Sequence, residues 1–265
     1  MSNPRLPAEI LDHVVDHLYD TEDTLKNCCL VSRSWVPRTR KHLFTRIALG
    51  TEQNLQTWKE TFPDPSVSPA RYTKSLLVRC SYAITAEDAE PGGWITGFSR
   101  VVHLEITPDT TDNLVPLQGF SPTIKSLRLR TTHLLSSQSF DLILSFPLLE
   151  DLTVITYYYK MLTHEADGSD GPRAVVQLSR SPVFTGSLEL CRREGIVSIA
   201  RLLLSLPGGI HFRELKLEWW RHGDVTITTA LVEGCSHTLE SVEISCSLFR
   251  TSIRHLSAPI TYSCF

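Results

Sequence analysis

The sequence lacks the features that define several large classes of protein. Its seven cysteines form no CxxC pair and are odd in number, which disfavours a disulfide framework and predicts reduced, mostly buried thiols. No apolar run approaches the roughly 20 residues that a membrane helix needs. The net charge of -3 gives no strong field that would favour nucleic acid or an acidic membrane as a partner. The segment from Met1 to Pro7 lacks a signal-peptide layout, and the cysteine pattern leads us to expect a cytoplasmic or nuclear protein.

Motifs of catalysis are also missing, with two weak candidates. The sequence has no glycine loop that cradles phosphate and no nucleophile elbow. His13, Asp16 and His17 resemble an inverted zinc-protease motif, but Asp replaces its Glu and no third ligand is signalled, so we interpret them as a solvated helix face. Cys191 has two arginines beside it, and a surface-strand cysteine is the simpler interpretation. The sequence predicts no catalytic residue, metal or cofactor.

The first 48 residues carry three short helical patterns. After Pro7, which suits the first turn of a helix, apolar residues recur at helical spacing: Ile10, Leu11, Val14, Val15 and Leu18. A polar turn at 20–24 follows, and a second helix is expected to run from Leu25 into Trp35. A third short helix is expected to hold Leu43, Phe44 and Ile47. A core of this size is marginal, and one internal seam cannot bury all of these residues, so we expect the unit to need a partner surface.

The order of residues in this segment resembles the F-box. The run LP-x-E-I-L at 6–11, then Leu25 and L-V-x-x-x-W at 30–35, is similar to the version of the motif common in fungal F-box proteins. The resemblance implies that the segment binds a Skp1-type protein and, through it, a cullin of a ubiquitin ligase. The Skp1-binding residues that it implies are Leu6, Pro7, Ile10, Leu11, Leu25, Leu30, Val31 and Trp35. The alternative is three helices that pack only on the rest of the same chain.

A short strand-like phrase recurs from Tyr72 onward. Each copy alternates apolar and polar residues, as a half-buried strand does. The apolar pairs of its seven copies are Leu76 and Val78, Leu104 and Ile106, Leu127 and Leu129, Leu152 and Val154, Leu188 and Leu190, Leu215 and Leu217, and Val242 and Ile244. Successive copies are 28, 23, 25, 36, 27 and 27 residues apart, and five of these intervals fall in the range of leucine-rich repeats. The long interval is explained by a loop-like stretch at 163–182.

Helix-like segments at 140–146, 196–206 and 228–233 separate some of these phrases. A strand, a crossover helix and the next parallel strand fit a curved solenoid whose strands line one concave face. The body therefore resembles leucine-rich repeats, although the usual asparagine or cysteine after each central leucine is missing. We expect an α+β or α/β chain with an F-box at 1–48, a connecting segment or partial first repeat at 49–71, and an irregular leucine-rich-repeat-like target-binding domain at 72–265. A compact α/β domain whose strands share a phrase is the alternative.

Candidates for target binding lie on or beside the strand phrases. Arg128 and Arg130 alternate with the inward leucines and can pair with acidic or phosphorylated groups, or else be neutralised by acidic neighbours. Adjacent aromatic residues on a strand cannot all face inward, so some of them should be exposed where a target could bind. The further candidates are Tyr157, Tyr158, Trp219 and Trp220. After Ile244 the chain stays apolar, so either this tail folds back as a cap or the chain is cut short.

The sequence thus predicts a substrate-recognition adaptor of a ubiquitin ligase. The F-box would bind Skp1 and the repeats would hold a protein target, which raises the effective concentration of a target lysine near ubiquitin carried by another protein. Two alternatives stay open. One is a Skp1-binding scaffold that never joins a cullin, and the other is a repeat-only interaction protein whose N-terminal helices are a cap. Nucleic acid and membranes are not expected as partners.

Overall fold

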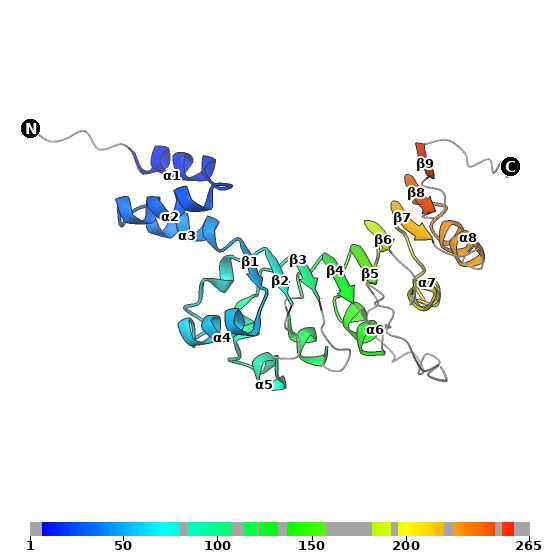
Figure 1. Cartoon of the computed structure of the whole chain (residues 1–265), viewed down its shortest axis with the longest axis horizontal. Helices are drawn as coiled ribbons and strands as arrows, with labels where there is room; N and C mark the ends of the chain where they lie inside the picture. The colour runs from blue at the N-terminus through cyan, green and yellow to red at the C-terminus, as the bar shows by residue number, and fades with distance from the viewer. Residues whose placement is uncertain are drawn as a thin grey trace, which may run out of the picture.

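A computed structural model describes residues 7–79, 84–107, 114–120, 122–131, 137–156, 182–191, 196–219, 225–246 and 251–256. These residues form three N-terminal helices followed by one nine-stranded sheet, in which the order of the strands follows the order of the chain (Figure 1). Strands β1 to β8 are parallel, and β9 pairs antiparallel with β8. The chain is therefore of the α/β class, built on a single parallel sheet with one antiparallel edge strand.

The N-terminal helices are α1 (Ala8–His17), α2 (Glu22–Val31) and α3 (Val36–Leu43). Three helices were expected, but two of their boundaries were wrong. The second helix ends at Val31, four residues before Trp35, which is instead the N-cap residue of α3. Pro37 lies in the first turn of α3, where its missing N–H leaves no hydrogen bond unmade. Ile47 does not belong to a helix, because a strand begins at Arg46.

The strands are β1 (Arg46–Leu49), β2 (Ser75–Val78), β3 (His103–Ile106), β4 (Ser126–Thr131), β5 (Asp151–Thr156), β6 (Ser187–Cys191), β7 (Glu214–Trp219), β8 (Ser241–Cys246) and β9 (Thr251–Leu256). All seven phrases of the sequence form strands, β2 to β8. The register pairs the first apolar residue of each phrase with that of the next, from Leu76 through Leu104 and onward to Val242. The apolar tail does fold back, as β9.

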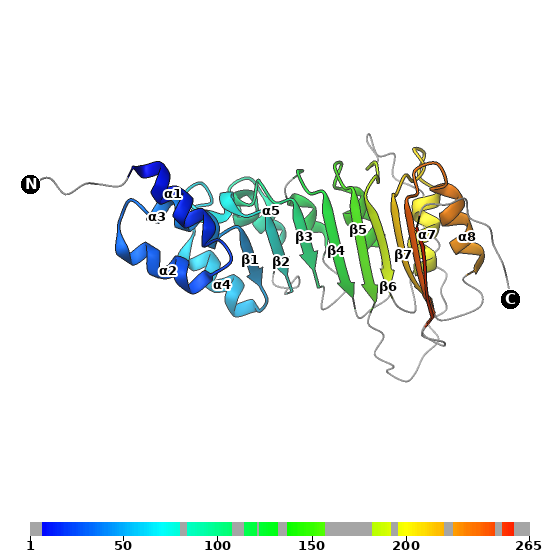
Figure 2. The ribbon, with the colours of Figure 1, turned by 90° about the horizontal axis from the view of Figure 1, so that it is seen from above.

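The connections carry the helices α4 (Glu52–Thr61), α5 (Ala86–Ala89), α6 (Ser137–Leu144), α7 (Ile196–Leu204) and α8 (Val225–Gly234), and the 3-10 helices η1 (Pro69–Tyr72), η3 (Trp94–Gly97) and η4 (Val115–Gly119). The three helical segments expected between phrases correspond to α6, α7 and α8. Figures 1 and 2 show these helices on one side of a curved sheet, so the opposite face of the strands lies on the inside of the curve. The loop expected at 163–182 lies almost entirely outside the described residues.

The body of the molecule buries its apolar residues in one continuous cluster between the sheet and these helices. The first apolar residues of the phrases form one ladder across the sheet and the second apolar residues form another, and both ladders line the sheet side of this cluster. Leu127, Leu152 and Leu188 in the first ladder are 0% exposed. Full burial of one such side chain contributes roughly 1.5–3 kcal/mol. Because every strand repeats the same alternation in the same register, each new strand extends both ladders and buries the one before it.

The N-terminal helices have a separate, smaller core. Its fully or nearly fully buried apolar side chains are Val15, Leu25 and Cys28, and none of them belongs to the cluster under the sheet. The two parts meet through β1, which follows α3 directly. Phe44 lies 6.3 Å from both Trp58 and Phe62, measured between ring centroids. Thr73 also donates a hydrogen bond from its hydroxyl to the carbonyl oxygen of Phe44, at 2.9 Å.

The segment at 49–71 lies between the end of β1 and the start of β2. It contains α4, which buries Leu55 and Trp58 on one face. The side chain of Thr51 caps this helix by accepting a hydrogen bond from the backbone N–H of Asn54 at 3.1 Å. Since β1 pairs with β2, the sheet begins before residue 48, and the boundary between the two parts falls between α3 and β1. No described helix has the length and apolar character needed to cross a membrane.

Candidate protein-interaction surfaces

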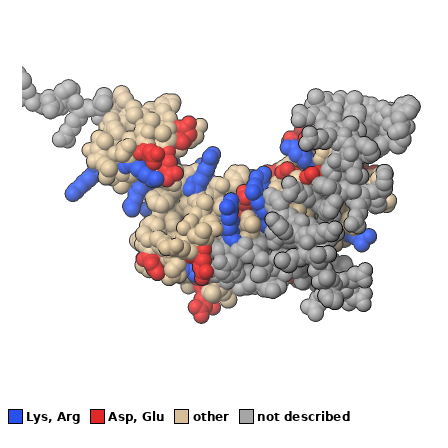
Figure 3. All heavy atoms as spheres, in the orientation of Figure 1, with Lys and Arg blue, Asp and Glu red and all other residues tan. Residues whose placement is uncertain are grey.

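Helices α1 and α2 leave large apolar side chains in solvent. Ile10 and Val14 on α1 are 49% and 45% exposed, and Leu30 and Val31 on α2 are 85% and 68% exposed. We call these four residues the N-terminal apolar set. On α1, Val15 faces the small core, and Ile10 and Val14 lie four residues apart on the strip beside it. Figure 3 shows a broad uncharged area over these helices, with charged side chains along its edges.

The significance of this set lies in the number of exposed apolar residues within one small helical unit, and not in any single position. A lone exposed leucine on a protein surface is ordinary, whereas several in one small helical unit are typical of an interaction site. Covering each of these side chains would contribute on the order of 1 kcal/mol or more, depending on the area removed from water. The body of the molecule leaves them uncovered, since none of the four packs against its apolar cluster.

The structure places the eight residues implied by the F-box resemblance in different environments. Ile10, Leu30 and Val31 belong to the N-terminal apolar set, and Pro7 is exposed beside them in the chain. Leu11 and Trp35 are half-buried, so each offers part of its surface. Leu25 is 1% exposed, so it supports the packing of the unit instead of contributing to its surface. Leu6 lies outside the described residues. Val14 is exposed with this group, although the motif did not include it.

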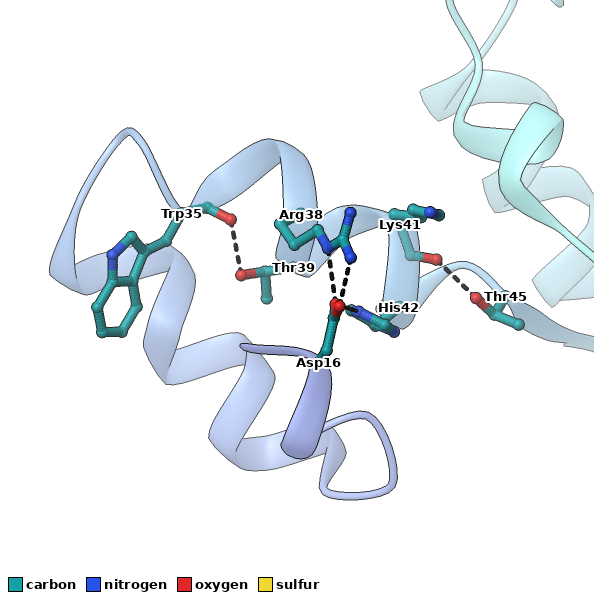
Figure 4. A network of polar contacts seen from close by, with 7 residues as sticks. All are labelled: Asp16, Trp35, Arg38, Thr39, Lys41, His42 and Thr45. Atoms are coloured by element: carbon teal, nitrogen blue, oxygen red, sulfur yellow. Dashed lines mark hydrogen bonds and ion pairs between the residues drawn. The ribbon is translucent and has the colours of Figure 1, made fainter. Parts of the chain in front are cut away.

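A part-buried ion network between α1 and α3 fixes the geometry of this unit (Figure 4). Asp16 on α1 accepts a hydrogen bond from Nε of Arg38 on α3 at 2.6 Å and a second, on its other oxygen, from the same guanidinium. Nε2 of His42 lies 2.7 Å from Asp16 Oδ1. The hydrogen bonds from Arg38 and then from His42 hold the pKa of Asp16 well below its ordinary value. Helices α1 and α3 are therefore tied together by a carboxylate that stays ionised.

This network changes the interpretation of one residue of the His13-x-x-Asp16-His17 pattern. His13 and His17 are exposed, as a solvated helix face requires, whereas the side chain of Asp16 is 33% exposed and turned toward Arg38 and His42 on α3. Among the described residues, no group of three His, Cys, Asp or Glu side chains has a geometry that could hold a metal ion. Beside the network, Thr39 is fully buried and donates its hydroxyl hydrogen bond to the carbonyl oxygen of Trp35 at 2.8 Å, which fixes the start of α3 (Figure 4).

The second candidate surface is the face of the sheet that the helices do not cover, which we call the open sheet face (Figure 2). It consists of the strand residues that alternate with the two buried ladders. The register aligns one row of them across the sheet: Leu77, Glu105, Arg128, Thr153, Glu189, Lys216 and Glu243. A partner lying on this face would contact one or two side chains from each strand.

Both arginines predicted to bind a target lie on the open sheet face and are already engaged there. Nε of Arg130 lies 3.0 Å from Oε1 of Glu105, and a terminal nitrogen of Arg128 lies 3.9 Å from Oε2 of Glu189. These pairs favour the alternative in which acidic neighbours neutralise the two arginines over the one in which both are free to bind a target. Trp219 ends β7, and its side chain lies outside the described part of the structure. Tyr157, Tyr158 and Trp220 also lie outside the described residues.

Cys191 ends β6 on the same face, half-buried. Its sulfur donates a hydrogen bond to Oε1 of Glu189 at 3.5 Å. A reactive cysteine needs a cationic neighbour that stabilises its thiolate, and a carboxylate has the opposite effect. This contact agrees with the interpretation of Cys191 as a strand cysteine.

Comparison with models of protein families, with curated proteins and with solved structures finds no match to this chain. The surfaces described above are therefore the basis for assigning a function.

Proposed function

We propose that this chain is a non-enzymatic F-box adaptor that binds a Skp1-type protein through α1 to α3 and a protein target through its sheet. The observation that carries the proposal is the exposure of Ile10, Val14, Leu30 and Val31 in a unit whose own core is small. The LP-x-E-I-L pattern and the later L-V-x-x-x-W pattern give the partner class, by resemblance to the F-box. Neither observation alone supports the proposal as strongly as their coincidence on the same two helices.

The body fits an irregular leucine-rich-repeat-like solenoid in this proposal. Its support is the recurrence of one phrase on seven successive parallel strands, with the connecting helices on one side only. Such an arrangement presents a long curved row of strand residues, which suits the capture of an extended protein segment. The antiparallel β9 then covers the last parallel strand, as the end of a solenoid requires.

The mechanism is catalysis by proximity. The chain holds a target on the sheet while the N-terminal helices attach it to the ligase, so that a target lysine meets ubiquitin carried by another subunit. The contacts of Phe44 with Trp58 and Phe62 keep the two binding surfaces in a fixed relation. A fixed relation matters because effective concentration falls when a joint between two sites becomes long and flexible.

The docking step is tested by replacing Ile10 and Leu30 together with aspartate in the full chain. We expect Skp1-type protein to lose binding by a factor of about 100 or more, because two desolvated charges would lie in an apolar contact. The matched control replaces Val67 and Val183, which are 72% and 60% exposed outside the helical unit, with aspartate. Isothermal titration calorimetry measures binding, and far-UV circular dichroism checks that both variants are folded. Equal binding by the two double variants would remove the docking assignment.

The adaptor role is separated from that of a plain Skp1-binding scaffold by a second measurement. A reconstituted ligase should ubiquitylate a protein captured by the sheet, and the aspartate variant at Ile10 and Leu30 should abolish that product while the captured protein stays bound. If Skp1 binds and no target is ever modified, the scaffold function replaces the adaptor function.

A further inference from the structure

The charged residues of the open sheet face are sorted by sign along the sheet. On β1 to β4 and the residue just after β2, this face carries four arginines, Arg46, Arg79, Arg128 and Arg130, against one carboxylate, Glu105. On β5 to β7 the balance is opposite, with Lys216 against four carboxylates, Asp151, Glu189, Glu214 and Glu218. Figure 3 shows basic side chains along the upper edge of the molecule above its first strands.

The two halves carry net charges of +3 and -3 when these residues are counted. Glu243 on β8 lies in register with Arg254 on β9, and these two opposite charges add nothing to the net charge of either half. The ion pairs on this face do not cancel the difference. Arg130 with Glu105 is a pair within the basic half, and the contact between Arg128 and Glu189 joins the halves at 3.9 Å. Arg46, Arg79 and Glu214 are exposed, and none of them forms an ion pair with another described residue.

Distance keeps the two halves electrostatically distinct. Neighbouring strands lie about 4.8 Å apart, so the centres of the halves are separated by roughly 17–20 Å. The Debye length at physiological ionic strength is about 8 Å. A charge on a bound partner therefore responds mainly to the half that it lies on, and a partner of uniform charge would gain on one half what it loses on the other.

From this sorting we infer that the open sheet face binds an extended segment of a partner protein whose own charges are segregated, acidic along β1 to β4 and basic along β5 to β7. The inference rests on the proposed function in taking the occupant to be a protein target. It specifies the class of target, which the F-box resemblance and the repeat pattern leave undetermined. A uniformly acidic ligand, such as a nucleic acid or a multiply phosphorylated peptide, would be repelled by the second half.

Four synthetic peptides test the inference directly on the full chain. The parallel strands span about 34 Å, which an extended peptide of about ten residues covers. The first peptide has acidic residues in one half and basic residues in the other, and the second has the same composition with the signs alternating. The third is wholly acidic and the fourth wholly basic. Fluorescence anisotropy at low ionic strength should rank the segregated peptide first by roughly tenfold, and the preference should disappear near 1 M salt.

Charge-reversal variants should change which peptide binds most tightly, whereas a neutral substitution would only weaken binding. Replacing Arg46 and Arg79 with glutamate changes the net charge of the first half from +3 to -1, so both halves become negative and the basic peptide should become the preferred ligand. Replacing Glu214 and Glu218 with lysine changes the net charge of the second half from -3 to +1, so both halves become positive and the acidic peptide should become preferred. Reversals at Arg201 on α7 and Glu233 on α8, which are exposed on the helical side, should leave the original ranking unchanged.

The outcomes separate this inference from the proposed function. If the segregated and alternating peptides bind equally, if neither binds, or if the reversals leave the preference unchanged, the charge-sorted site is refuted, whatever the Skp1 result. If the peptides and reversals behave as expected while the chain fails to bind Skp1-type protein, the docking proposal fails and the site on the sheet stands. Skp1 binding, measured on each variant, should not change, because no reversed residue lies on α1 or α2.

Discussion

The sheet body and the N-terminal helices contain similar proportions of leucine, isoleucine and valine, but they bury these residues to different extents. In the body, each strand presents its apolar residues in register with the next, so ladders such as Leu104, Leu127 and Leu152 are at most 1% exposed. In the helical unit, Val15 and Leu25 are buried while Ile10 and Leu30 stay in solvent. A repeating fold can bury every new apolar residue against the previous unit, whereas three short helices have too little interior.

The comparison also locates the joint between the two parts. Leu49 at the end of β1 is 2% exposed and belongs to the large cluster, and Phe44 and Ile47 pack against that cluster. Thr39, only a few residues earlier, is buried within the helical unit. The change from one core to the other therefore takes place over the few residues between α3 and β1, and two truncations on either side of it should behave differently.

Truncation gives the largest expected effect. Removing residues 1–43 deletes the helices and leaves Phe44 and β1 in place, so the sheet should stay folded with its melting temperature nearly unchanged. Removing residues 1–50 also deletes β1, which exposes the edge of β2 and uncovers Leu55 and Trp58. The longer truncation should aggregate or lose a large part of its stability. Differential scanning calorimetry of the two proteins checks this difference.

Unfolding of the sheet in both truncated proteins would mean that the helices and the sheet form one cooperative unit. That result would favour the repeat-only alternative, in which the N-terminal helices serve as a cap. A sheet that survives only the shorter truncation supports two separate cores.

Single substitutions in the two cores test their separation with a smaller expected effect on stability. Leu152→Ala in β5 should lower the free energy of unfolding of the sheet by about 2–5 kcal/mol, because it opens a cavity at a fully buried position. Leu25→Ala removes a side chain that is equally buried, and its effect should stay within α1 to α3. Amide hydrogen exchange with mass spectrometry reports each segment separately. Faster exchange across β2 to β8 in Leu25→Ala would contradict the separation of the cores.

Much of the sheet was predictable from the sequence because its signal is local and repeated. Each phrase needs only two apolar residues two positions apart, with a polar residue between them in six of the seven copies, and the copies at similar intervals reinforce one another. β1 was missed because Ala48 stands where the other phrases place a larger or polar residue and because the helical pattern runs up to it. The interval was a usable signal, since Ile47 precedes Leu76 by 29 residues and pairs with it.

The details of the helical unit were less predictable because they depend on contacts between distant residues. The sequence indicated more apolar residues than one seam can bury, and this surplus is present. It could not tell that Leu25 is buried and Leu30 exposed, because both fit the same helical pattern. The partners of Asp16 lie 22 and 26 residues away, and no local pattern predicts that they meet.

The ion network gives the smallest effect of the series and reports on the helical unit alone. Asp16→Asn should destabilise α1 to α3 by about 1 kcal/mol at neutral pH, a modest value because the three side chains are partly exposed. The sheet should not respond, since none of the three side chains touches its core. Asp12→Asn is the matched control, because Asp12 is an exposed carboxylate on the same helix whose charge acts on Arg38 more weakly than that of Asp16.

The pH dependence of this difference follows from the direction of the pKa shift. The pKa of Asp16 is lower in the folded unit than in the unfolded chain, so its contribution is present above the unfolded value of about 3.9 and is lost as pH falls toward the folded value. Hydrogen exchange of α1 and α3 in the parent and in Asp16→Asn should therefore differ at pH 7 and converge as the medium is acidified below about 4. A difference that stays constant on acidification would show that Asp16 acts through packing and not through its charge.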